Sequence, residues 1–392
     1  MADNLKYYKI KDIPMNIHGR IDTSYDLIPL LSNGHGIEVS VQGSQLWADV
    51  EANHENFEPW VAIEINGELI SRFMLDKGSH RLCLLRGVSP EQTTRVKLYR
   101  ELQAMSEDPK TCITIKGLWT DGDFREPPSY DHRFEFIGDS ICSGEGTYGA
   151  RTDMDWTAYC MSYSRTYANL IGKELNAECR VISQGGWGVF SGWNNNRRHV
   201  IPDYYEHICG LASGYALSTK GGMLPADDPD IDVAKMSTGD RYGAGRAYDF
   251  GSWVPEVIFI NLGTNDREGF NQPPFTDPDT GKTYSLRTDP DGSFCREDME
   301  LIINAAVGFL KKVRKNNPAS HIVWLYGMLG YDLNLTLAEA LNRYRTESGD
   351  GNVAYLELPS VNDRTIGARS HPGYESHRIV AGILTDYLKT VL

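Results

Sequence analysis

The sequence predicts an α/β fold built on a doubly wound parallel sheet and preceded by an all-β sandwich of jelly-roll type. Apolar residues alternate with a period of two from about residue 37 to 119, which is typical of strands with one buried face. Strand-like and helix-like segments alternate from about residue 133 onward, which is typical of βαβ units. Between the two regions stands Pro127-Pro128, a stiff pair that cannot donate ladder hydrogen bonds.

The chain is long enough for about two domains, because it has 392 residues. We expect a sandwich domain over residues 1–125, a linker over 126–132 and an α/β domain over 133–392.

The predicted sandwich consists of short alternating runs. Asn66-Gly67 separates two of them, and this dipeptide is preferred in a two-residue type I′ hairpin turn because both positions need a positive φ. The alternating apolar residues are Ile37/Val39/Val41, Val61/Ile63/Ile65, Leu82/Leu84, Val96/Leu98 and Ile113/Ile115.

The predicted α/β domain alternates strands with amphipathic helices. The clearest helix covers residues 296–315, with apolar residues at three-four spacing. In such a sheet, ligands bind at the carboxyl ends of the strands. The expected strands are 134–137, 180–183, 257–262, 322–326 and 353–358, and the expected helices are 164–175, 296–315, 336–345 and a last one carrying Ile379, Val380, Ile383, Leu384, Tyr387 and Leu388.

Two long stretches, at about 202–253 and 272–294, interrupt this order. Loops of this length serve as functional lids or oligomer contacts, or are tolerated surface insertions. The sequence leaves these roles open, and it leaves the oligomeric state open as well.

The charge balance excludes one class of partner. Lys and Arg number 39 against 53 Asp and Glu, so the net charge is -14 and nonspecific binding to nucleic acid is disfavoured. No segment approaches the ~18 apolar residues of a membrane span, and the first residues lack the profile of a secretory signal. We therefore expect a soluble, cytoplasmic protein with no membrane partner, unless a leader was trimmed.

The seven cysteines are scattered, with no Cys-x-x-Cys pair and no metal-ligand spacing. We expect them to be buried free thiols, and we expect neither a metal nor a cofactor.

An apolar strand runs directly into Gly138-Asp139-Ser140, and this turn makes a hydrolase the leading hypothesis. It would lift Ser140 to the end of a parallel strand as a nucleophile. A plain strand-ending turn is the alternative, because all three residue types favour turns. A serine hydroxyl also needs a base and donors that stabilise an oxyanion, so the rest of the chain must supply both.

Three further segments supply candidates for those roles. Asn265 follows a strand in Gly263-Thr264-Asn265-Asp266, where its amide can donate to an oxyanion. The glycines of Gln184-Gly185-Gly186-Trp187-Gly188 let backbone N–H groups approach a ligand. His371 stands in a βα-type loop directly before the last helix. The structural alternatives are an ordinary turn, a tight backbone and a helix-entry histidine.

These four blocks occur in the same order as in the SGNH (GDSL-type) hydrolases, which residues 133–392 resemble. A sandwich placed before such a domain further resembles carbohydrate esterase family 2, whose members remove acetyl groups from plant polysaccharides. The resemblance implies a flavodoxin-like sheet, Ser140 as nucleophile and His371 as base. It also implies an oxyanion hole made by the N–H of Ser140, the N–H of Gly186 or Gly188, and the Asn265 side chain.

One departure concerns the third member of the triad. The family usually carries Asp three residues before the histidine, and here that residue is Ala368. In enzymes resembling family 2 a backbone carbonyl can orient the imidazole instead, so the resemblance implies a Ser-His dyad. Asp363 is the alternative acid, reachable only if the intervening loop folds back.

The expected substrate is an acetylated oligosaccharide of hemicellulose type, from mannan or xylan. Trp187 and Trp193 have rings that suit a sugar face, although Trp is more often a core residue, and we expect Asp139 to line the same site. The alternatives are a transacetylase or small-ester hydrolase using the same site, and a carbohydrate-binding protein with an inactive serine. The sequence identifies neither the polysaccharide nor the ring position of the acetyl group.

Overall fold

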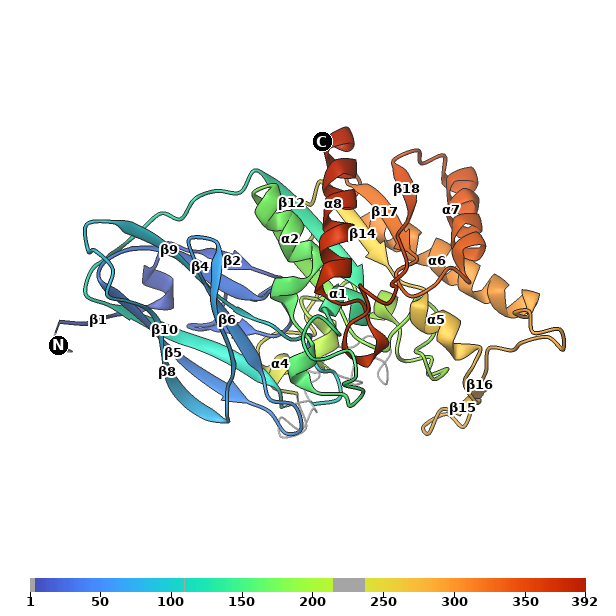
Figure 1. Ribbon diagram of the computed structural model, residues 1–392, viewed down its shortest axis with the longest axis horizontal. Helices are drawn as coiled ribbons and strands as arrows, with labels where there is room; N and C mark the ends of the chain where they lie inside the picture. The colour runs from blue at the N-terminus through green and yellow to red at the C-terminus, as the bar shows by residue number, and fades with distance from the viewer. Residues whose placement is uncertain (1–3, 109, 214–236) are drawn as a thin grey trace.

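The computed structural model describes residues 4–108, 110–213 and 237–392. It places a two-sheet sandwich beside a five-stranded parallel sheet flanked by helices (Figure 1). Part of the stretch predicted as the first insertion, residues 214–236, lies outside the described residues.

The sandwich consists of two antiparallel sheets. One has the order β1-β10-β5-β8, with β3 also paired to β10, and the other has the order β11-β4-β9-β6-β7, with β2 also paired to β4. Their facing side chains form one aliphatic core. The strands are β1 (Lys6–Lys9), β2 (Asn16–His18), β3 (Ile28–Leu30), β4 (Gly36–Gln42), β5 (Gln45–Asn53), β6 (Trp60–Ile65), β7 (Glu68–Met74), β8 (Gly78–Arg86), β9 (Thr93–Arg100), β10 (Cys112–Thr120) and β11 (Asp123–Arg125).

The period-two pattern is confirmed as a set of strands with one buried face. In β5, for example, Leu46, Ala48 and Val50 are buried while the residues between them are more exposed. The predicted hairpin turn is also confirmed. Asn66 and Gly67 join β6 to β7, and both have positive φ, 53° and 88°.

The second region is a parallel sheet of the order β13-β12-β14-β17-β18 with helices on both faces. The predicted α/β class is therefore confirmed. A small hairpin, β15 with β16, lies within the stretch 272–294. The strands are β12 (His132–Gly138), β13 (Ala177–Ser183), β14 (Val257–Asn261), β15 (Phe275–Thr276), β16 (Thr283–Tyr284), β17 (His321–Tyr326) and β18 (Val353–Glu357), and the helices are α1 (Ser140–Ser143), α2 (Tyr167–Glu174), α4 (Thr238–Arg241), α5 (Thr264–Gly269), α6 (Arg296–Asn316), α7 (Asn334–Ser348) and α8 (Tyr374–Val391).

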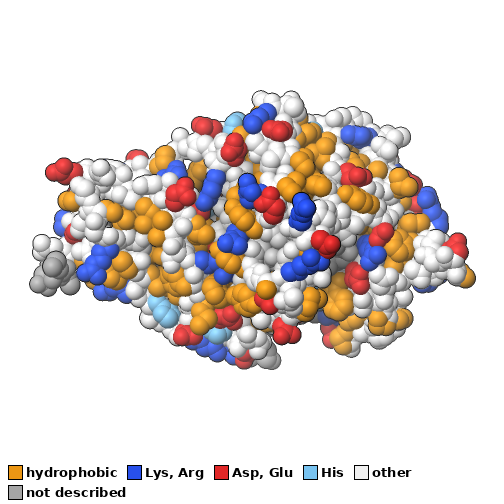
Figure 2. Space-filling model, viewed as in Figure 1, with side chains coloured by type: hydrophobic (Ala, Val, Ile, Leu, Met, Phe, Trp, Pro, Cys, Tyr) orange, Lys and Arg blue, Asp and Glu red, His pale blue; other side chains and the backbone are white. Residues whose placement is uncertain are grey.

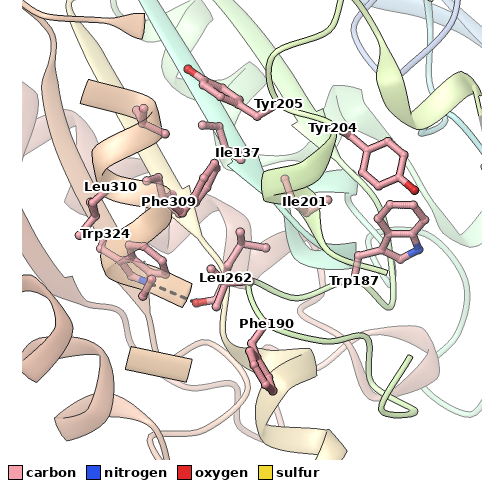
Figure 3. Close-up of a cluster of buried hydrophobic side chains, with 14 of the residues drawn as sticks. Ile137, Trp187, Phe190, Ile201, Tyr204, Tyr205, Leu262, Phe309, Leu310 and Trp324 are labelled. Carbon is pink, nitrogen blue, oxygen red and sulfur yellow. Dashed lines mark hydrogen bonds between the residues drawn. The ribbon is translucent and has the colours of Figure 1, made fainter. Parts of the chain in front are cut away.

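Both faces of this sheet are apolar, which explains its continuous hydrophobic strands. In β14, Ile258 and Ile260 pack toward α6 and α7, whereas Val257 and Phe259 pack toward α2 and α8. Figure 3 shows the first of these cores, where Leu310 of α6 lies close to Trp324 of β17.

The strand order reverses beside β12, and this position locates the site. The first strand in sequence, β12, pairs with β13 on one side and β14 on the other. A crevice forms at the carboxyl ends of strands at such a reversal. Ser140 follows β12 and Asn265 follows β14, so both residues stand at this edge.

The two regions are packed together through polar and aromatic contacts. Arg20, between β2 and β3, forms a buried ion pair with Glu135 of β12 at 2.8 Å. Tyr99 of β9 packs edge-on against Tyr163, with ring centroids 5.6 Å apart. The predicted linker, residues 126–132, lies between β11 and β12, apart from its last residue, which begins β12.

Six of the seven cysteines are buried free thiols, as expected, and Cys83 is exposed.

On the face in Figure 2, acidic and basic side chains are interspersed among hydrophobic ones. Among residues 4–108, 110–213 and 237–392, no helix has the length and apolarity needed to span a bilayer.

Candidate active site

The Gly138-Asp139-Ser140 turn places Ser140 at the start of the short helix α1. The turn is tight, because a Cβ atom on Gly138 would lie 2.2 Å from the sulfur of Cys142. Asp139 caps the helix, since its Oδ1 accepts a hydrogen bond from the N–H of Ile141 at 3.0 Å. A glycine is therefore required at the end of β12, because a side chain there would collide with the helix that begins with Ser140.

The structure brings Ser140 and His371 together. The Oγ of Ser140 lies 3.0 Å from the Nε2 of His371. The other ring nitrogen, Nδ1, lies 2.9 Å from the backbone carbonyl oxygen of Arg369. With a proton on Nδ1, the nitrogen that faces the serine is free to accept the hydroxyl proton.

Neither candidate position supplies an acid that hydrogen-bonds to this imidazole. Ala368 has no polar side chain, and Asp363 is 90% exposed and paired with Arg151 at 2.7 Å. Among the described residues the nearest carboxylate is Glu145, whose Oε1 lies 3.8 Å from Nδ1 of His371. Sequence analysis missed Glu145, although its place between Gly144 and Gly146, five residues after the serine, was a usable signal.

Asn265 is almost buried, and its amide already has two acceptors. Its Nδ2 donates to the carbonyl oxygen of Trp187 at 2.9 Å and to Oδ2 of Asp139 at 3.2 Å. These contacts tie the end of β14 to the glycine-rich block and to the serine turn. The amide therefore reaches the serine turn, as the predicted role requires.

The glycine-rich block lies beside the serine, and its N–H groups are not equivalent. The N–H of Gly188 donates to the carbonyl oxygen of His199 at 3.1 Å, and that of Gly185 donates to Oε1 of Gln103 at 2.8 Å. The N–H of Gly186 has no hydrogen-bond acceptor among the residues that the structure describes.

Asp139 was expected to contact the substrate, and this expectation is wrong. The side chain is fully buried, and its carboxylate oxygens accept hydrogen bonds from the N–H of Ile141 and the amide of Asn265. Burial raises the pKa of its carboxyl group to about 7, and the nearby carboxylates of Asp266 and Glu145 contribute in the same direction. Asp139 is therefore part of the scaffold beneath the site.

Of the two tryptophans, only Trp193 has an accessible ring. Trp187 is 2% exposed, its ring stacks on His199 and it meets Tyr204 edge-on, so its expected role as a sugar platform is wrong (Figure 3). Trp193 is 45% exposed, and its Cδ1 lies 3.0 Å from the position that a Cβ on Gly186 would take. An exposed aromatic ring therefore borders the glycine-rich block.

Comparisons with known proteins agree on the family of the chain. No protein-family model matches the chain. A solved family two carbohydrate esterase from Clostridium thermocellum shares the fold with a TM-score of 0.74, at 22% identity over 96% of this chain and 98% of that one. The acetyl xylan esterase Est2A from Butyrivibrio proteoclasticus is 46% identical, covers 98% of both chains and superposes with a TM-score of 0.91. The chain belongs to the family 2 carbohydrate esterases.

Two curated relatives of this family 2 chain are more distant. The cellulase/esterase CelE of Acetivibrio thermocellus is 23% identical over 390 residues, which is 96% of this chain and 39% of CelE. The acetylxylan esterase/glucomannan deacetylase of Cellvibrio japonicus is 21% identical over 366 residues, which is 92% of this chain and 83% of that protein. The chain thus spans well under half the length of CelE.

Proposed function

We propose that this family 2 esterase removes O-acetyl groups from hemicellulose-type oligosaccharides through a Ser140-His371 dyad. The observation that carries the proposal is the 3.0 Å contact between Ser140 Oγ and His371 Nε2 at the switch point of the sheet. The names of the similar proteins, an acetyl xylan esterase and an acetylxylan esterase/glucomannan deacetylase, support xylan or mannan as the polymer.

The dyad accounts for both halves of the reaction. Nε2 of His371 takes the hydroxyl proton while Oγ of Ser140 bonds to the acetyl carbonyl carbon, and the imidazolium returns the proton to the sugar oxygen as that C–O bond breaks. Water then attacks the acetyl-serine and gives a proton to Nε2, which passes it to Oγ as the C–Oγ bond breaks; the acetic acid released ionises to acetate in water. The first proton transfer follows the Ser140–His371 hydrogen bond already formed in the resting site, and the last one restores it.

The oxyanion of each tetrahedral intermediate would be stabilised by three donors. They are the N–H of Ser140, the N–H of Gly186 and the Asn265 amide, which would exchange its 3.2 Å contact with Asp139 for the oxyanion. We assign the second donor to Gly186 rather than Gly188, because the Gly188 N–H already donates a hydrogen bond to the carbonyl oxygen of His199.

The neighbouring features suit a sugar ester. Trp193 offers an exposed ring next to the oxyanion donors, and aromatic faces pack well on the C–H faces of sugars.

The strand order of the sandwich supports its assignment as a jelly roll. Eight of its strands have the orders β3-β10-β5-β8 and β4-β9-β6-β7, which is the two-Greek-key winding of that fold.

Acetylated xylo- and manno-oligosaccharides, followed by mass spectrometry with parallel assay of acetate, test the proposal. We expect stepwise loss of acetyl groups with an equal amount of free acetate. Acetyl groups that move onto an added acceptor sugar would instead show a transacetylase. Binding without acetate release would show a carbohydrate-binding protein.

Ser140→Ala is the decisive variant, and it should abolish acetate release. Ser143→Ala is the matched control, because Ser143 lies in the same short helix but bonds to Ser183 Oγ at 2.7 Å instead of to the histidine. Substantial turnover by folded Ser140→Ala would overturn the assignment of the nucleophile.

A further inference from the structure

The loop that carries the base has an unusual backbone. Arg369 and Ser370, directly before His371, both have φ of 56°, which is the left-handed region that side chains other than glycine rarely adopt. Such conformations cost free energy and persist only where surrounding contacts hold them. This backbone turns the carbonyl oxygen of Arg369 onto Nδ1 of His371.

The side chain of Arg369 is held by contacts from outside its own loop. Its Nε donates to Oε1 of Glu145 at 2.6 Å and its Nη1 donates to the carbonyl oxygen of Met154 at 2.7 Å. Its backbone N–H donates to the carbonyl oxygen of Asp153 at 2.7 Å. The carbonyl that orients His371 therefore belongs to a residue tethered at three atoms.

Glu145 links this tether to the nucleophile. Its backbone N–H donates to the carbonyl oxygen of Ser140 at 3.0 Å, and its side chain is only 6% exposed. A Cβ on the next residue, Gly146, would lie 2.7 Å from Cβ of His371, so the turn passes directly against the histidine loop. One rigid turn thus fixes the distance between serine and histidine.

We infer that Glu145, acting through Arg369, is the positioning residue that replaces the missing triad acid. The carboxylate holds the guanidinium, the guanidinium holds the loop, and the loop presents its carbonyl to Nδ1. In addition, the Glu145 charge 3.8 Å from Nδ1 stabilises the imidazolium that forms during attack, which a neutral carbonyl does less well. This inference rests on the proposed Ser140-His371 mechanism.

The other charged groups near His371 do not supply this function. His377 of α8 is buried, and burial lowers its pKa to about 3, so it stays neutral. Asp139 lies behind the serine and is used as a helix cap. The carboxylate of Asp153 is turned to the N–H of Ala150 and the hydroxyl of Tyr159.

Opposite charge changes at Glu145 and Arg369 test the inference. Glu145→Gln should lower kcat by about 10- to 100-fold with little change in KM, and should move the acid limb of the pH-rate profile to lower pH. Arg369→Gln should move that limb to higher pH, because it removes a positive charge and leaves the Glu145 carboxylate without its cationic partner. Arg369→Lys keeps the charge and should restore the wild-type limb. Rates are normalised to active sites titrated with a serine-directed phosphonate.

The controls are Arg151→Gln and Asp363→Asn, an exposed pair in neighbouring loops, which should change neither kcat nor the limb. A limb that moves in the same direction in Glu145→Gln and Arg369→Gln, or that stays fixed in both, would overturn the inference. If Glu145→Gln does not fold, the two Arg369 variants give the same test. The proposed function fails separately, if Ser140→Ala retains activity or if acetylated oligosaccharides yield no free acetate.

Discussion

At the residue scale, the site consists of groups whose hydrogen bonds are already formed before substrate binds. Asn265 shows this best, because its one amide nitrogen joins the glycine-rich block to the serine turn. In its proposed role as an oxyanion donor Asn265 would be preorganised, and preorganisation is what makes such donors effective.

Asn265→Ala should therefore lower kcat by on the order of a hundredfold, with little change in KM. Steady-state kinetics on an acetylated oligosaccharide measures both constants. Asn261→Ala is the matched control, since Asn261 is buried in the same segment but donates to Tyr167 Oη at 3.1 Å. A higher KM with unchanged kcat would instead assign Asn265 to binding of the ground state.

Asp139 should make stability depend on pH. Burial raises its pKa to about 7, so the folded state favours the protonated form and the unfolded state titrates near the ordinary value of about 4. The stabilisation is thus complete below about pH 4 and is lost as pH rises toward 7.

Thermal unfolding of wild type and Asp139→Asn between pH 4 and 8 measures this effect. We expect the variant's midpoint to rise relative to that of wild type as pH increases, because asparagine cannot ionise. Asp386→Asn, at an 82% exposed side chain, should instead follow the wild-type curve. Parallel curves for Asp139→Asn and wild type would contradict the prediction.

At the scale of elements, strong periodicity predicted what formed, and local contacts decided where each element ends. The helix expected over 164–175 begins later, as α2 (Tyr167–Glu174), because Thr166 caps it by accepting the N–H of Asn169 at 3.4 Å. The three residues before that cap form a 3-10 turn instead. By contrast, the helix expected over 296–315 is confirmed almost to the residue as α6.

The loop between β18 and α8 carries His371, the proposed base. Asp363 lies in it, but the side chain points to solvent and pairs with Arg151. Asp363→Asn should therefore change kcat by less than about twofold, because the side chain does not contact His371 and an exposed ion pair contributes little free energy.

His371→Ala, in the same loop, should cost nearly as much activity as Ser140→Ala, because it removes the base. The measurement is kcat of Asp363→Asn, His371→Ala and Ser140→Ala under identical conditions. A loss of roughly 10⁴-fold in Asp363→Asn, the size seen when a triad acid is neutralised, would show that Asp363 acts on His371 after all.

At the scale of the whole molecule, sequence analysis singled out Ser140 and His371, which lie 3.0 Å apart, but missed the residues that hold them. The two blocks carry local signals, namely a strand-ending turn and a helix-entry loop. The tether between Glu145 and Arg369 joins residues 224 positions apart, and no periodicity or turn chemistry marks such a pair. The prediction that Trp187 binds sugar failed for a related reason, since burial of a tryptophan depends on partners distant in sequence, such as Tyr204.

The sandwich also reaches the site, through Gln103 in the segment between β9 and β10. Its Oε1 accepts the N–H of Gly185 across 82 positions, and a Cβ on Gly185 would lie 3.4 Å from Cβ of Ser140. One amide of the first region thus braces the glycine-rich turn of the second. The sandwich therefore supports the backbone beside the proposed nucleophile.

Gln103→Ala should consequently reduce kcat by about tenfold and destabilise the fold by about 1–3 kcal/mol, because it leaves the Gly185 N–H without its acceptor. Gln103→Glu keeps an acceptor oxygen but adds a negative charge beside the developing oxyanion, so its kcat should fall further while the fold stays more stable than in Gln103→Ala. Gln45→Ala is the control, since Gln45 is bonded to Trp47 within β5. Wild-type kcat in both Gln103 variants would show that the glycine-rich turn holds its shape without the sandwich.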